Sequence, residues 1–106
     1  MQGSKRFVYI LRSVNEPDRT YVGLSSDVAE RLAAHNAGHS PHTARYRPWQ
    51  FVVAVELADE NSAARFEQYL KSGSGRAFAK RHFTEASSSG SAAKLFRLGL
   101  TSDTSA

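Results

Sequence analysis

The chain of 106 residues contains no cysteine, which excludes disulfide bridges and thiolate metal sites. It also lacks an apolar run long enough for a signal peptide or a membrane-spanning helix. Hydrophobic residues make up 41% of the sequence, a share typical of a folded domain rather than a disordered segment. We therefore expect one main folded domain, cytoplasmic and without membrane contact.

Acidic residues are missing from two stretches, 31–55 and 68–83. The first stretch contains three arginines and three histidines, and the second contains five basic side chains. Basic stretches without acids are typical of surfaces that bind a phosphate backbone. A solvated basic surface is the simpler alternative, and the formal net charge of +4 does not decide between them.

Two short β-type segments surround a polar turn near the start of the chain. Residues 7–11 (FVYIL) and 20–23 (TYVG) are rich in Val, Ile and Tyr, which predicts an antiparallel hairpin. Because side chains alternate along a strand, Tyr9 and Tyr21 could meet on one surface. Gly23 would let a ligand or another backbone come close beside Tyr21.

Periodicity, capping residues and prolines divide the rest of the chain into elements. We expect a helix that begins after Ser26 or Asp27 and stops at 36–38, a loop over 39–48, a strand over 49–57, a helix over 61–71, and a Gly-Ser loop with a short basic helix over 72–83. The expected class is α/β (α+β), with a small three-stranded, mainly antiparallel sheet flanked by helices. Residues 1–83 would form the domain, and 84–106 a Ser- and Ala-rich tail.

An apolar patch, LFRLGL at 95–100, interrupts this tail. We expect it to form a short helix or strand that docks on the body, and 87–91 to form a linker. The patch is also a candidate docking site for a protein partner.

Several polar side chains fall on the apolar faces of the predicted helices. Arg31 and His35 share the side of Val28. Glu67 lies in the middle of the apolar face of the second helix, where an unpaired carboxylate would be costly. Glu67 should therefore have a cation, a metal or a ligand as its partner.

The full set of motifs resembles the GIY-YIG nuclease superfamily, whose name records two tripeptides on neighbouring strands. Here they would be 7–9 and 21–23, followed by Asp-x-x-x-Arg-Leu-x-x-His at 27–35, Pro-Trp at 48–49 and Glu67 ahead of Leu-Lys. The resemblance covers about residues 6–83. It extends to the small stand-alone members and to the structure-specific endonuclease subunit branch.

The resemblance implies a metal-dependent endonuclease that hydrolyses DNA phosphodiester bonds. Tyr9 would orient or deprotonate the attacking water, with His35 assisting or replacing it as the base. Arg31 would clamp the scissile phosphate, because its planar fork suits two oxygens. Tyr21 would hydrogen-bond the phosphate or the water. Glu67 would hold one divalent ion, Mg²⁺ or Mn²⁺.

The expected partner is DNA, whether single-stranded, duplex or branched, together with a protein partner or a second copy of the chain. A loop that interleaves arginine with tyrosine can pair with phosphates and stack a ring on a base. A Gly-Ser loop can also present backbone N–H groups to a phosphate. The residues expected to bind nucleic acid are Arg45, Tyr46, Arg47, Lys71, Arg76 and Lys80.

The sequence departs from the family pattern at two points. Phe7 stands where the family name has glycine, and no asparagine occurs after Asn61. These departures favour an alternative in which the chain binds nucleic acid without cleaving, and the apolar patch at 95–100 favours a third, an adaptor that acts only with a protein partner.

Each candidate also has a structural alternative. The tyrosines could be packing residues, His35 a core histidine, and Arg31 and Glu67 an interhelical salt bridge. A further alternative is a metal held by three histidines, His35, His39 and His42.

Overall fold

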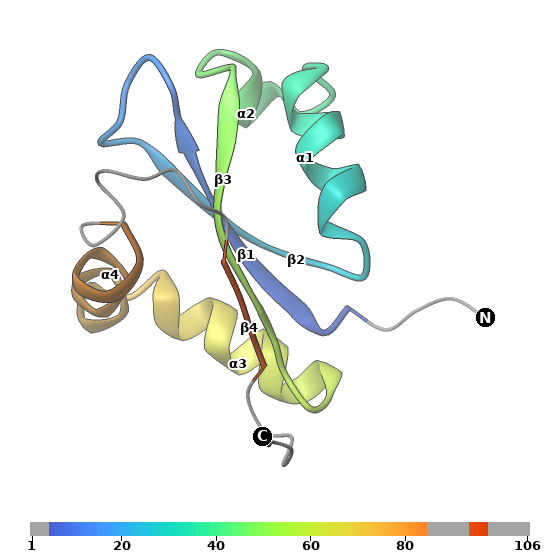
Figure 1. Ribbon diagram of the computed structural model, residues 1–106, viewed down its shortest axis with the longest axis vertical. Helices are drawn as coiled ribbons and strands as arrows, with labels where there is room; N and C mark the ends of the chain where they lie inside the picture. The colour runs from blue at the N-terminus through green and yellow to red at the C-terminus, as the bar shows by residue number, and fades with distance from the viewer. Residues whose placement is uncertain (1–4, 85–93, 98–106) are drawn as a thin grey trace.

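The computed structural model describes residues 5–84 and 94–97. Its sheet contains β1 (Phe7–Ser13), β2 (Thr20–Ser25), β3 (Trp49–Glu56) and β4 (Lys94–Arg97) in the order β2-β1-β3-β4 (Figure 1). The first three strands pair antiparallel with β1 at the centre, which confirms the predicted hairpin and the α+β class.

The fourth strand, β4, was not part of the predicted sheet. It pairs parallel to β3 and comes from the start of the apolar patch, for which a helix or a strand had been expected. The remainder of the patch and the expected linker over 87–91 lie outside the described residues. The sheet therefore includes a segment from the far end of the chain.

Within residues 5–84 and 94–97, five helical segments accompany the sheet: α1 (Val28–Asn36), α2 (Pro41–Ala44), α3 (Glu60–Leu70), α4 (Gly73–Ala79) and the π-helical turn η1 (Lys80–Thr84). The predicted cap of α1 is confirmed, because the Asp27 side chain accepts the N–H of Glu30. The expectation of an unbroken loop over 39–48 is wrong. A proline fits the first turn of a helix, and the Ser40 carbonyl accepts the first backbone bonds of α2.

Helices cover both faces of the sheet. Apolar residues of α1 pack on the face that carries Tyr9 and Leu11, whereas α3, α4 and η1 pack on the face that carries Val8 and Ile10. Strand alternation on β1 therefore separates two cores. Figure 1 shows α1 and α3 on either side of the strands.

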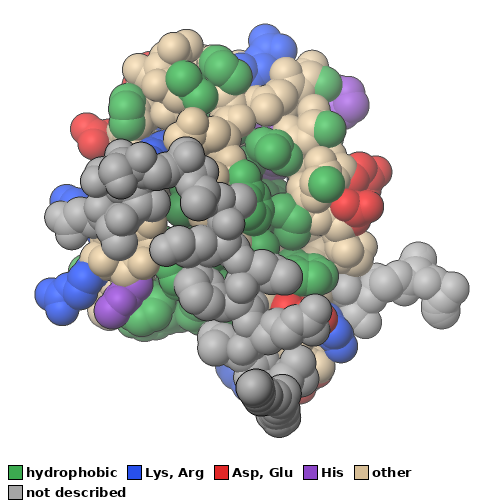
Figure 2. Space-filling view, in the orientation of Figure 1, with side chains coloured by type: hydrophobic (Ala, Val, Ile, Leu, Met, Phe, Trp, Pro, Cys, Tyr) green, Lys and Arg blue, Asp and Glu red, His purple; other side chains and the backbone are tan. Residues whose placement is uncertain are grey.

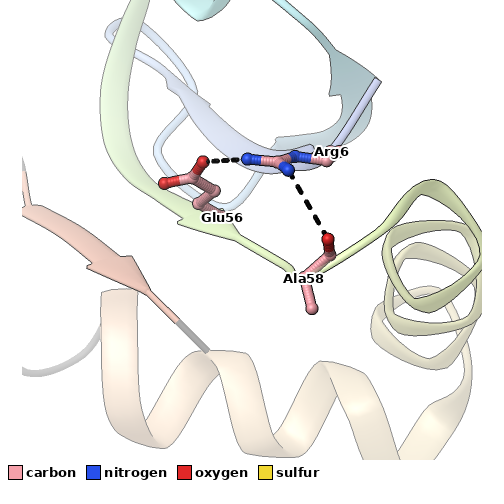
Figure 3. A network of polar contacts seen from close by, with 3 residues as sticks. All are labelled: Arg6, Glu56 and Ala58. Atoms are coloured by element: carbon pink, nitrogen blue, oxygen red, sulfur yellow. Dashed lines mark hydrogen bonds and ion pairs between the residues drawn. The ribbon is translucent and has the colours of Figure 1, made fainter. Parts of the chain in front are cut away.

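An ion pair fixes the start of β1 to the end of β3. Arg6 pairs with the largely buried Glu56 and also donates to the carbonyl of Ala58 (Figure 3). On the face drawn in Figure 2, hydrophobic side chains gather toward the middle, and Lys and Arg side chains lie at the rim. Among the described residues, no helix combines the length and the apolar character that crossing a bilayer requires.

Candidate active site

The hairpin register brings the two predicted tyrosines together. Tyr9 pairs with Gly23 and Leu11 pairs with Tyr21, so both phenols lie on the α1 face with their ring centroids 6.1 Å apart. A Cβ at Gly23 would lie 2.6 Å from the Tyr9 hydroxyl oxygen and 2.9 Å from the Tyr21 ring. The glycine makes room for the phenols themselves, which the sequence alone did not indicate.

Helix α1 adds two side chains to these phenols. The Tyr9 hydroxyl oxygen lies 3.1 Å from Nε2 of His35, and the Tyr21 ring centroid lies 4.7 Å from that of His35. The Arg31 guanidinium lies beside the Tyr9 side chain. We call Tyr9, Tyr21, Arg31 and His35 the tyrosine cluster, and all of its members were predicted as catalytic residues.

The tyrosine cluster is closed on one side and open on the other. Tyr9 and His35 are each only 1% exposed, whereas Tyr21 and Arg31 are half-buried. Solvent therefore reaches the cluster through Tyr21 and Arg31, with Tyr9 and His35 behind them.

Burial decides the charge states inside the cluster. Burial raises the pKa of Tyr9, and the hydrogen bond from Arg31 opposes this shift without cancelling it. The pKa of His35 is lowered, first by burial and then by the charge of Arg31. At neutral pH, Tyr9 is therefore a phenol and His35 a neutral imidazole.

Thr43 is a contact of the cluster that the sequence did not reveal. Its hydroxyl oxygen lies 2.9 Å from Nδ1 of His35, and its side chain is buried. The Trp49 indole donates to the Thr43 carbonyl over 2.9 Å, which fixes α2 against β3. In the sequence, the only sign of this contact was that Thr43 follows His35 by eight residues, and the segment around Thr43 was interpreted as a loop.

Glu67, the predicted metal ligand, lies on α3 and pairs with Lys71. Helix α3 packs on the sheet face opposite the one that carries Tyr9. In the described part of the chain, no hydrogen bond or ion pair joins Glu67 to the tyrosine cluster, so the alternative of a salt bridge with Arg31 is not formed. This carboxylate was expected to need a partner. The partner in the structure is Lys71, which follows it by four residues.

Chemically, Glu67 is suited to holding one divalent ion. Its side chain is 15% exposed, so its oxygens can be reached from solvent. Mg²⁺ uses only one or two protein carboxylates and takes its other ligands from water and phosphate. An ion there would compete with Lys71 for the oxygens. No group of three His, Asp or Glu side chains suited to a metal occurs in the described residues, and His39 and His42 are exposed while His35 points inward.

An open cleft of about 890 Å³ lies between the turn end of the hairpin and the junction of α3 with α4. Ile10, Val22 and Leu70 belong to its lining, which places it on the α3 face. The predicted nucleic-acid residues from this part of the chain all line it, together with two arginines that the prediction had not included. The basic side chains of the lining are Arg12, Arg19, Lys71, Arg76 and Lys80.

Tyr21 belongs to both the cluster and the cleft. It lies on β2, the edge strand of the sheet, where the two faces meet. The Gly-Ser loop near the cleft was expected to present backbone N–H groups to a phosphate. One of these groups, the N–H of Gly75, instead donates to the hydroxyl of Ser72, which caps α4.

The predicted Arg-Tyr-Arg motif lies at the other side of the cluster. The guanidinium groups of Arg19 and Arg45 lie 4.6 and 5.4 Å from the centroid of the Tyr46 ring. The same ring meets Trp49 edge-on and is half-buried, so one part of it packs in the core. Arg47 is exposed and donates to the Ala44 carbonyl. Because Arg19 also lines the cleft, it connects the two predicted groups of nucleic-acid residues.

Comparison with known proteins identifies the domain. Residues 5–82 match the family model described as the GIY-YIG catalytic domain. The chain is 37% identical over 71 residues to the UPF0213 protein SpyM3_1077 of Streptococcus pyogenes serotype M3, an alignment covering 66% of this chain and 74% of the relative.

Two fungal proteins are similar over a shorter part of their length. The structure-specific endonuclease subunit slx1 of Talaromyces marneffei is 37% identical over 65 residues, which is 56% of this chain and 17% of the relative. The structure-specific endonuclease subunit SLX1 of Candida dubliniensis is 37% identical over 82 residues, which is 71% of this chain and 27% of the relative. The chain thus spans about a quarter or less of these fungal relatives. No solved structure matches.

Proposed function

Because the chain belongs to the GIY-YIG family, a class of phosphodiester-hydrolysing nucleases, we propose that it is a metal-dependent endonuclease that cleaves DNA with low sequence specificity of its own. The observation that carries the proposal is the convergence of the tyrosine cluster. Residues from β1, β2 and α1 meet around Gly23, which is free of a side chain where the two phenols pass.

The cluster supplies the groups that phosphodiester hydrolysis requires. Arg31 faces the accessible side and can donate to two phosphoryl oxygens, which offsets the charge that develops in the transition state. Tyr21 can hydrogen-bond the phosphate or the attacking water. Tyr9 orients this water or takes its proton. Because Tyr9 is itself protonated, it can take the water proton only as it gives its own hydroxyl proton to the neutral His35.

Glu67 is the residue that we propose for the divalent ion, Mg²⁺ or Mn²⁺. When bound, such an ion would supply Lewis acid stabilisation to a phosphoryl group that reaches the α3 face of the sheet. Lys71, released from the carboxylate, would be free to contact a phosphate in the cleft that it lines.

Nucleic acid is proposed to lie along the basic cleft and over the edge strand β2. Five cations line the cleft beside the apolar side chains of its floor, and Tyr21 links it to the cluster. Arg45, Tyr46 and Arg47 extend the same basic surface through Arg19. Phosphates would pair with the cations, and the apolar floor would receive sugars or bases.

The fungal relatives suggest the biological setting. They are called subunits of structure-specific endonucleases, which supports DNA of branched shape as a substrate and a protein partner for this chain. The alternative to a different protein partner is a second copy of this chain. We place the protein in the cytoplasm, with a role in DNA repair, a nuclease domain over 1–83 and a tail over 84–106 that adds β4 to the sheet.

A second candidate function is a nucleic-acid-binding module without turnover. The low exposure of Tyr9 favours it, because a water molecule must displace existing contacts to reach that phenol. Phe7, which replaces the glycine of the family name, packs against the core around Tyr9 and helps to close it.

Cleavage assays separate these functions. Purified protein would be incubated with single-stranded, duplex and branched DNA, with and without Mg²⁺, beside Arg31→Ala and Glu67→Ala. Arg65→Ala is the matched control, because Arg65 is an exposed arginine on α3 that does not line the cleft. We expect Mg²⁺-dependent cleavage that both site variants abolish and the control retains. Cleavage unchanged in both site variants would refute the assignment, and binding without cleavage in any metal would favour the module.

A further inference from the structure

The buried imidazole of His35 has a partner at each ring nitrogen. Nε2 lies 3.1 Å from the Tyr9 hydroxyl oxygen, and Nδ1 lies 2.9 Å from the Thr43 hydroxyl oxygen. A neutral imidazole donates from one nitrogen and accepts at the other, so these two contacts must run in the same direction.

A donor beside Tyr9 is compatible with a hydrogen bond from Tyr9 to His35. The Arg31 guanidinium can only donate, and it lies beside the Tyr9 side chain. With this donor beside its oxygen, Tyr9 has its own hydroxyl hydrogen available for Nε2 of His35. Nδ1 then carries the ring proton and donates to Thr43.

The other end of the chain of hydrogen bonds sets this direction. The Thr43 hydroxyl lies 3.5 Å from the Ser40 carbonyl, which can only accept. Thr43 thus donates toward Ser40 and accepts from His35. Ser40 is the N-cap residue of α2 and Thr43 lies within this short helix. The helix therefore holds the Thr43 hydroxyl beside the His35 imidazole.

We propose that Thr43 is a positioning residue that selects the His35 tautomer with the proton on Nδ1, which leaves Nε2 as the acceptor for the Tyr9 proton. The inference rests on the proposed nuclease function, in which Tyr9 passes its proton to His35. The transfer is balanced: the Tyr9 O–H bond breaks, an N–H bond forms at Nε2, and Nδ1 keeps its proton. Thr43 remains neutral and contacts neither substrate nor metal.

The other tautomer would interrupt the proposed step. With the proton on Nε2, His35 would donate to Tyr9 and could take nothing from it. A valine at position 43 has a similar shape but no acceptor, so a buried Nδ1–H would lose its partner. The ring would then change to the tautomer that cannot accept from Tyr9.

The direct test is ¹⁵N NMR of the histidine rings in the metal-free protein, because protonated and unprotonated ring nitrogens have distinct chemical shifts. We expect Nε2 of His35 to be unprotonated in the native protein and in Thr43→Ser, and protonated in Thr43→Val. The exposed His42 is an internal control and should show no change. A protonated Nε2 in the native protein, or an unchanged tautomer in Thr43→Val, overturns the proposal.

Turnover provides the second measurement. Thr43→Val should lower kcat by about 10²-fold, within the range of general-base contributions, at unchanged KM, and Thr43→Ser should restore most of it. The fluorescence of Trp49, the single tryptophan, reports whether position 43 is still in place, because its indole binds the Thr43 backbone. A fall in kcat of equal size in Thr43→Ser, with Trp49 unchanged, would also contradict the proposal. If no variant or native protein cleaves DNA, the nuclease function fails while the tautomer assignment is still decided by NMR.

Discussion

On the α1 face of the sheet the polar groups are buried and bonded to one another, whereas on the α3 and α4 face the basic groups line an open cleft. Tyr9 and His35 have almost no exposed surface. Arg76 and Lys80, by contrast, are exposed. Preorganised groups in a site shielded from water act strongly on a reacting centre, while exposed cations bind a polyanion without fixing its sequence. The comparison supports our proposal that Tyr9, Arg31 and His35 act on the α1 face and that the cations of the other face hold nucleic acid, with Glu67 as the one proposed catalytic group on that second face.

Arg31→Lys should give the largest effect and tests the chemical side of this division. Lysine keeps the charge but lacks the planar fork that can donate to Tyr9 and to phosphate together. We expect kcat to fall by roughly 10²- to 10³-fold, as for other lost donors to a transition state, with DNA affinity little changed. Single-turnover kinetics and binding isotherms would measure the two effects. An equal loss in affinity would mean that Arg31 is mainly a binding group and would weaken the division.

Gly23→Ala should damage the α1 face through packing alone. The added methyl group would lie 2.6 Å from the Tyr9 hydroxyl oxygen, so the phenols must move apart. We expect a loss of about 1–3 kcal/mol in the free energy of unfolding, typical of overpacking, together with reduced cleavage. Denaturant unfolding would measure it. Gly73→Ala is the matched control, because no atom lies within 4 Å of a Cβ there.

The pH dependence of stability should come partly from His35. Its pKa in the folded protein is below the ordinary value of 6.5, so the unfolded chain binds a proton more readily. The free energy of unfolding should therefore fall as the pH drops below about 6.5, and stability should be regained as the pH rises. The ring contacts Tyr9, Tyr21 and Thr43 and lies near Arg31, and none of these residues has a carboxylate.

Unfolding curves between pH 7.5 and 5.5 for the native protein and His35→Gln would measure this contribution. The substitution should remove the His35 part of the slope, because glutamine does not titrate. Equal slopes in the two proteins would show that His35 protonates as easily in the folded chain as in the unfolded one.

Arg76→Gln should give the smallest effect and tests the binding face. If this side chain contacts one phosphate, its loss should lower the salt dependence of DNA binding by about 0.7–0.9 in the slope of log K against log salt concentration. Cleavage at saturating DNA should be unchanged. Fluorescence anisotropy at several salt concentrations would measure the slope, with Arg65→Gln as the control outside the cleft. Unchanged slopes in both variants would remove Arg76 from the proposed path.

The sequence predicted most of the elements because each has a strong local signal. Alternating Val, Ile and Tyr indicated the hairpin, and Asp27 marked the start of α1. Helix α2 was missed because four residues carry no hydrophobic period. The strand β4 was ambiguous because its pairing with β3 depends on contacts far apart in the chain.

For the candidate site, the sequence alone determined which residues could carry the chemistry, since two tyrosines, an arginine and a histidine follow at spacings that place them on neighbouring strands and one face of a helix. Only the tertiary structure decided how they are paired. It gave His35 a second partner in Thr43, assigned Lys71 to Glu67, and explained Gly23 by the space that the phenols occupy. Periodicity fixes the face on which a side chain lies, whereas its partner depends on which elements pack against that face.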